Sequence, residues 1–253
     1  MRRFAFVRLA FVLAAMFVTC AAGAARAQTS ADLTAIETAA ACSPPPTYDE
    51  APANAPRIIG SQDVIPRSLF SNHDILVIGA GTGAGVQLGQ EFFIRRTIHF
   101  GSSPLGRGAR TLGWLRVVAV NESTSIATVQ HACGGIITTD YLEPFVAPVV
   151  PAGAERDDTP GQPDFSNLGH VIVGNEDRGS AGAGDFVLID WGQEHGLTAG
   201  ARFAIYRDVG INGLPLAAIG EGIVISTGSA MALTRITRSR DAVFSGDYIA
   251  LRK

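Results

Sequence analysis

The architecture of this chain is decided by a stretch that occurs twice: DILVIGAGTGAGVQLGQEFFIRR at residues 74–96 and DFVLIDWGQEHGLTAGARFAIYR at residues 185–207. The two stretches align without a gap at a constant offset of 111 residues. Each contains an apolar run, a turn with glycines and a second apolar run, in the same order. A repeat at a fixed offset is typical of a duplicated structural unit, so we expect both stretches to fold in the same way.

The correspondence resumes after one change in loop length. Residues 112–113 correspond to residues 219–220, and Asp140 corresponds to Asp247, now at an offset of 107 residues. Because changes in length are best tolerated in loops, the second copy has simply lost loop residues. Short β-branched and aromatic runs separated by turn residues predict strands in both copies. The predicted strands are residues 75–78, 91–95, 114–120, 126–130 and 141–145 in the first copy, and 186–189, 202–206, 222–226, 232–236 and 248–251 in the second.

These strands predict an all-β fold made of two tandem copies of a small five- to six-stranded barrel-like module. A closed or half-closed barrel is favoured because it solves the problem of exposed sheet edges in a unit too small for a sandwich. We expect module 1 to span residues 57–145 and module 2 to span residues 168–253. Residues 28–56, rich in Ala and Pro, are predicted to be a disordered tether, and the Pro-rich residues 146–167 are predicted to be a linker.

The N-terminus has the order of a secretory signal. A basic start is followed by an apolar middle and by the small-residue exit Ala25-Arg26-Ala27, which predicts a signal peptide over residues 1–27 with cleavage before Gln28. We therefore expect a protein of the periplasm, or of the periplasmic face of the outer membrane, with no transmembrane span after cleavage. An uncleaved membrane anchor and lipidation of Cys20 are the alternatives.

Charge narrows the range of partners. Loss of residues 1–27 removes four arginines and no acidic residue, and this changes the formal net charge from −3 to −7. An acidic surface repels phosphate groups, so we expect no nucleic-acid binding.

Two cysteines, Cys42 and Cys133, remain after cleavage. An oxidising compartment permits a disulfide between them, and the alternative is a buried Cys133 with an exposed, unpaired Cys42. His131 and Cys133 could present two soft ligands on one strand face, but two ligands do not complete a zinc site. The second copy has Arg238-Ser239-Arg240 at the equivalent place, and no metal site is predicted.

The recurrent glycines are interpreted as structural. A residue that tolerates positive φ is needed where the chain reverses between strands. The positions concerned are Gly85, Gly89, Gly196 and Gly200.

Residues 79–85 of the first copy also satisfy the dinucleotide-binding fingerprint after an apolar run. The pattern that follows is strand-like rather than helical, and residues 190–195 of the second copy lack the fingerprint although the surrounding frame is kept. We therefore interpret the run as a turn and expect no cofactor. A periplasmic redox or cofactor protein that uses this run is an alternative.

No catalytic residue is predicted. The sequence contains none of the motifs Gly-x-Ser-x-Gly, Ser-x-x-Lys and His-Glu-x-x-His. Asp140 and Asp247 recur at equivalent positions, but each directly precedes a strand and is expected to hydrogen-bond within its own turn.

The frame of residues 85–96, a glycine-led strand at Gly113 and the triplet Asp140-Tyr141-Leu142 resembles small β modules of Gram-negative envelope proteins. It is most similar to the C-terminal domain of flagellar assembly protein T and to modules of secreted proteins that carry LysM peptidoglycan-binding domains. The resemblance implies a non-catalytic binding or scaffold protein of the cell envelope, with an envelope protein or peptidoglycan as partner. A secreted hydrolase with a site assembled from loops is the alternative.

Overall fold

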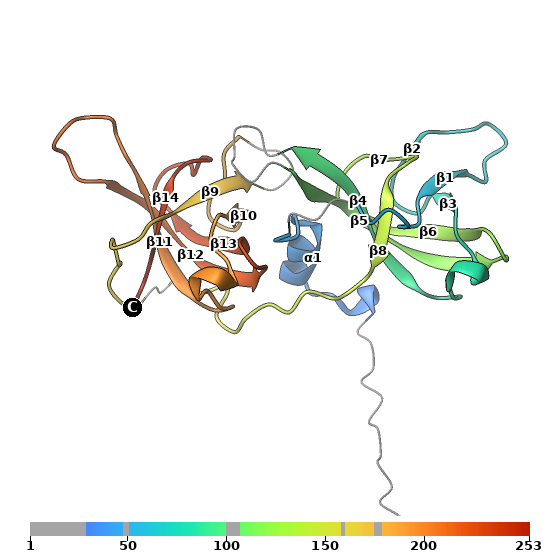
Figure 1. The fold of residues 1–253 in the computed structure, drawn as a ribbon, viewed down its shortest axis with the longest axis horizontal. Coiled ribbons are helices and arrows are strands. Elements are labelled where there is room, and N and C mark those ends of the chain that lie inside the picture. Colours follow the sequence, from blue (N-terminus) through green and yellow to red (C-terminus); the bar gives the residue numbers. More distant parts are fainter. Residues whose placement is uncertain (1–28, 48–50, 100–106, 158–159, 175–178) are drawn as a thin grey trace, which may run out of the picture.

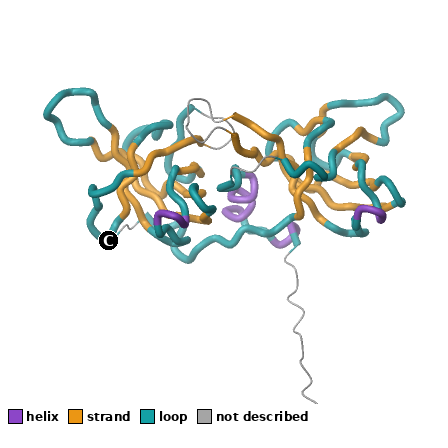
Figure 2. Tube along the Cα trace, in the orientation of Figure 1, coloured by secondary structure: helices purple, strands orange, loops and turns teal. Residues whose placement is uncertain are grey.

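The computed structural model describes residues 29–47, 51–99, 107–157, 160–174 and 179–253. Two β structures lie at opposite ends of the molecule, with helix α1 (Ala35–Cys42) between them (Figure 1). Strands dominate the regular structure, as Figure 2 shows, and the predicted all-β class is confirmed. The predicted signal peptide, residues 1–27 with Cys20, lies outside the described residues. Within the described part of the chain, no helix is both long and apolar enough to cross a membrane.

Module 1 is an antiparallel sheet in the order β1-β3-β6-β5-β4-β8. Its edge strands β1 and β8 approach each other through an isolated bridge between Arg57 and Tyr141, but they do not close a barrel. A separate ribbon of β2 and β7 contributes Phe70 and Ile136 to the core. The strands are β1 (Ile58–Ser61), β2 (Leu69–Phe70), β3 (Ile75–Ile78), β4 (Glu91–His99), β5 (Arg107–Val120), β6 (Ser125–Ala132), β7 (Ile136–Ile137) and β8 (Tyr141–Pro144).

Module 2 is a closed six-stranded barrel in the order β10-β13-β12-β11-β14-β9. Along β10, Val187 and Ile189 point into the barrel core, while Phe186 and Leu188 belong to a second apolar cluster on its outer face. Because side chains alternate between the two faces of a strand, a run of four buried apolar residues requires cover on both faces. The strands are β9 (Gly169–Gly174), β10 (Phe186–Ile189), β11 (Arg202–Arg207), β12 (Ala217–Thr227), β13 (Ala232–Ser239) and β14 (Tyr248–Leu251).

The strand order is the same in the two modules when β1 is paired with β9, β3 with β10, and so on to β8 with β14. Local irregularities correspond as well, because the register shifts between Ile94 and Arg95 in module 1 and between Ile205 and Tyr206 in module 2. These two shifts are separated by the same 111 residues that relate the repeated stretches. The origin of the modules as tandem copies of one unit stays a prediction.

The predicted disordered tether is wrong for residues 29–47. Thr34 and Glu37 form a capping box that starts α1, with Thr34 N–H donating to Glu37 Oε2 at 2.8 Å. Ala40 then packs into the outer cluster of module 2, and Ala41 packs against Phe93 of module 1. Tertiary contact on both sides stabilises a helix that is too short to be stable by itself.

The predicted linker is also held in place by packing. Ala154 is buried in the outer cluster of module 2, and its carbonyl accepts a hydrogen bond of 2.6 Å from Arg235. Gly153 accepts another from Arg202 at 2.7 Å. The linker therefore packs on module 2 from Val150 to Arg156.

Candidate functional site

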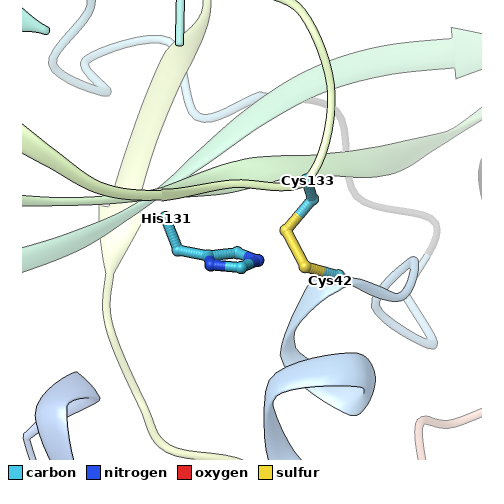
Figure 3. Close-up of side chains that lie close together, drawn as sticks. All are labelled: Cys42, His131 and Cys133. Carbon is cyan, nitrogen blue, oxygen red and sulfur yellow. A yellow bond between two sulfur atoms is a disulfide. The ribbon is translucent and has the colours of Figure 1, made fainter. Parts of the chain in front are cut away.

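The candidate site lies where α1 meets module 1. Cys42, at the end of α1, and Cys133, just after β6, form a disulfide with their Cα atoms 5.4 Å apart and a sequence separation of 91. His131 lies beside this pair on β6, and one ring nitrogen and the two sulfurs lie within 4.8 Å of one another (Figure 3). Among the described residues, this is the one group of three half-buried side chains of types that hold metal ions.

Aromatic packing fixes the ring of His131. The imidazole stacks on Trp114 with 4.6 Å between ring centroids and 19° between planes. Trp114 in turn contacts Phe93 and Phe145, with centroids 6.5 and 5.7 Å away. Burial in this environment lowers the pKa of His131 below its ordinary value, so the imidazole is neutral at neutral pH and keeps a lone pair.

A surface cavity of about 460 Å³ opens beside Cys133. Its lining includes Cys133, the adjacent Gly134, and Arg67 and Asp74. The last two form an ion pair of 3.0 Å. Cys133 is the member of the group that lines this cavity, since Cys42 and His131 are not part of its lining.

Buried polar contacts attach the segment after α1 to module 1. The hydroxyl of Thr111 donates to the carbonyl of Ser43 at 2.7 Å and also accepts a hydrogen bond from Arg95. Arg95 further donates to Glu143 at 3.3 Å, and its guanidinium lies 4.2 Å from the centroid of Phe93. Burial lowers the pKa of Arg95, while Glu143 opposes the shift. The network holds the site in place but adds no group to it.

Asp140 and Asp247 have structural partners. Arg96 donates to Asp140 from Nε at 2.8 Å and from Nη2 at 2.9 Å, and the amide of Ile137 donates to the same carboxylate at 2.8 Å. Arg207 donates to Asp247 from the same two atoms, both at 2.8 Å. Each carboxylate also accepts from a turn amide three residues before it, as the turn interpretation requires.

The glycine run forms one turn of 3-10 helix, η2 (Thr82–Ala84), between β3 and β4. The amides of Thr82 and Gly83 donate to the carbonyls of Asn121 and Glu122, both at 2.9 Å. A bound pyrophosphate would need such amides free at the start of a longer helix. The geometry agrees with the turn interpretation and offers no phosphate cradle at these two amides.

The second module repeats this geometry. The turn η4 (Gln193–His195) begins at Gly192, which has the same backbone conformation as Gly81. A Cβ would lie 2.2 Å from Asn121 O at Gly81 and 2.4 Å from Ser229 O at Gly192. These two glycines are required because the backbone passes directly against a neighbouring hairpin, a reason that the sequence pattern alone does not reveal.

The four glycines of the predicted turns all have positive φ. The values are 81° at Gly85, 79° at Gly89, 73° at Gly196 and 88° at Gly200.

A histidine and a carboxylate meet in module 2. Nδ1 of His170 lies 2.9 Å from Asp190 Oδ2, and the ring of His170 is 5.1 Å from that of Tyr248. Asp190 also accepts the backbone amide of His170 at 2.5 Å. An imidazole oriented by a carboxylate is a part of many hydrolytic sites, and no spacing pattern in the sequence predicts this pair.

The grouping of Cys42 with His131 was not predictable from sequence spacing, because Cys42 comes from helix α1, far from His131 and Cys133 in the sequence. Asp140 and Asp247, by contrast, lie in separate modules at the starts of β8 and β14 (Figure 1). The structure therefore does not bring these two carboxylates together.

Comparison with protein-family models and with curated proteins gives no match for this chain. The similarity to envelope modules thus stays a prediction.

Proposed function

We propose that this chain is a non-catalytic binding or scaffold protein of the cell envelope, located in the periplasm or on the periplasmic face of the outer membrane. The observation that carries the proposal is the joining of two β modules into one unit by α1 and the linker. Ala40 and Ala41 contact different modules, and Ile98 of module 1 packs against the outer cluster of module 2. A unit of this kind presents its loops at fixed distances from one another.

Two loops that lie at opposite ends of the molecule (Figure 1) carry exposed apolar residues. The loop between β1 and β2 presents Val64, which is 100% exposed, and Ile65, which is 78% exposed. The loop between β11 and β12 presents Ile211 and Leu214, also exposed. Exposed apolar groups gathered on a loop are typical of protein interaction sites, so an envelope protein is favoured over peptidoglycan as the partner.

The test uses the intact exported chain, because α1 packs on both modules and separated halves would lose that contact. The protein is immobilised and used to capture envelope proteins, and in parallel it is sedimented with purified sacculi. Substitution of Val64 and Ile65 by Ser should abolish capture of a defined partner. Val149→Ser, at another exposed apolar position in the linker, is the matched control and should leave capture unchanged. Capture that is equal in all three proteins would contradict a role for this loop.

The alternative, a secreted hydrolase, is favoured by one observation, the pairing of His170 with Asp190. Cell-wall, peptide and ester substrates should be screened with the wild type and with His170→Gln. Turnover that is lost in this variant, with folding intact, would establish the hydrolase and overturn the scaffold proposal. Absence of turnover in the wild type would support the scaffold.

A further inference from the structure

The fold adds a third soft ligand to the two that lie on β6. His131 and Cys133 come from one strand and its extension, and Cys42 is brought beside them by α1. We propose that, once the disulfide is reduced, Cys42, Cys133 and His131 bind one thiophilic d¹⁰ cation, Zn²⁺ or Cu⁺.

The distances suit such an ion. Zn–S bonds of about 2.3 Å in tetrahedral geometry place two sulfurs roughly 3.8 Å apart. With Cα atoms 5.4 Å apart, the cysteine side chains can reach that separation by rotation about χ1. The ligand atoms already lie within 4.8 Å of one another, so the backbone does not need to move to bring His131 into the set.

The surroundings support a metal site on both sides. Stacking on Trp114 restricts the orientation of His131, and fixed ligand orientation strengthens metal binding. Cys133 also lines the surface cavity of about 460 Å³, so one ligand residue of the site lies next to solvent. Three protein ligands are enough for Cu⁺, while Zn²⁺ would complete its tetrahedron with a water molecule from that cavity.

The two states of the site exclude each other. A dithiol reductant transfers two electrons and two protons to the disulfide, becomes a disulfide itself, and leaves Cys42 and Cys133 as thiols. Binding of the cation then releases the two thiol protons, because the ligands are thiolates. Reoxidation of the pair by a disulfide oxidant removes both electrons, reforms the sulfur–sulfur bond and expels the ion.

Module 2 contains no second copy of this site. Arg238 and Arg240 occupy the positions that correspond to His131 and Cys133, so the expected stoichiometry is one ion per chain.

The experiment titrates the intact exported protein anaerobically in the presence of a phosphine reductant. Zn²⁺ and Cu⁺ are added separately, in competition with a chromophoric chelator, and thiolate-to-metal absorption in the ultraviolet is followed. We expect one ion per chain in the reduced protein and none in the oxidised protein or in the Cys42→Ser/Cys133→Ser variant. The ion that binds with the higher affinity is the one that the site prefers.

Two histidine variants test the third ligand. His131→Gln should weaken binding at least about tenfold, because even the loss of an outer-shell partner has that effect. His195→Gln is the matched control, since His195 also stacks on a tryptophan, Trp191, at a centroid distance of 5.8 Å. It should bind as the wild type does.

Three results would overturn the proposal. The first is reduced wild type that binds neither ion more tightly than the double serine variant. The second is His131→Gln with wild-type affinity. The third is reduced protein whose near-ultraviolet tryptophan signal is lost and is restored by neither ion.

Discussion

Asp140 and Asp247 occupy the same place in the two modules, each held by two hydrogen bonds from an arginine of the adjacent strand and by an amide of its own turn. Both carboxylates are almost fully buried, at 3% and 5% exposed. Loss of the charge leaves Arg96 without its carboxylate partner and leaves Arg207 with only Asp241, 3.6 Å away.

Asp140→Asn should therefore lower the free energy of unfolding by about 2–3 kcal/mol, and Asp247→Asn by a similar amount. Denaturant unfolding monitored by circular dichroism measures both. Glu122→Gln, on an exposed side chain, is the control and should change stability by less than about 0.5 kcal/mol. If both aspartate variants were as stable as the wild type, the paired charges would contribute nothing to the free energy of unfolding.

Reduction of the Cys42–Cys133 disulfide should destabilise the protein by about 2–4 kcal/mol, because a long loop is released in the unfolded chain. The comparison is between unfolding curves with and without a reductant, in the presence of a chelator. Cys133→Ser should reproduce the effect of the reductant and should become insensitive to it. A reduced protein as stable as the oxidised one would contradict this prediction.

Stability should also fall as the pH is lowered through the range just below 6.5. Burial depresses the pKa of His131 in the folded protein below its reference value of 6.5, so the unfolded chain binds a proton that the folded one does not. The contribution is fully present above pH 6.5 and is lost as the pH falls toward the folded pKa. His131→Gln should flatten this part of the profile, and the same slope in both proteins would assign the effect to other groups.

Gly81→Ala should cost roughly 2–4 kcal/mol, because its Cβ would lie 2.2 Å from Asn121 O and 2.6 Å from Glu122 O. Gly83→Ala, whose Cβ would approach Glu122 O only to 3.1 Å, is the milder control in the same turn. Thermal unfolding measures the loss of stability in the two variants and ranks them.

Calorimetry with NAD and FAD on the wild type should show no binding. Micromolar binding that is lost in a folded Gly81 variant would restore the dinucleotide interpretation.

The strand pattern was largely predictable, and the misses have physical causes. All ten predicted strands lie on strands of the structure. Strands β1 and β9 were missed because glycine and polar residues such as Gly60 and His170 interrupt their apolar pattern, and β2 and β7 were missed because each is only two residues long. Strand β5 begins earlier than predicted because the register shifts beside Gly113, where Ile94 pairs with Gly113 and Arg95 pairs with Thr111. A glycine at such a bulge interrupts the apolar pattern from which a strand is predicted. Barrel closure is confirmed for module 2, while module 1 remains an open sheet.

Disorder was predicted for residues 28–56 because a composition rich in Ala and Pro outweighed the one local signal for a helix. The capping box of Thr34 and Glu37 was present in the sequence, but its helix is stabilised by residues far along the chain. For the same reason the cluster of Cys42, His131 and Cys133 could be proposed only from the structure, since no spacing rule connects ligands on a helix and a strand of different segments.

The position of α1 has a consequence for the order of folding. Ala40 belongs to the same buried cluster as Phe186 and Leu233, which are synthesised long after it. The helix can reach its final place only when module 2 is complete, because this cluster joins Ala40 to residues as far along the chain as Leu233. Docking of α1 is therefore a late folding step that follows the folding of module 2. A chain that stops after module 1 would leave the Ala40 side of the helix without its packing partner.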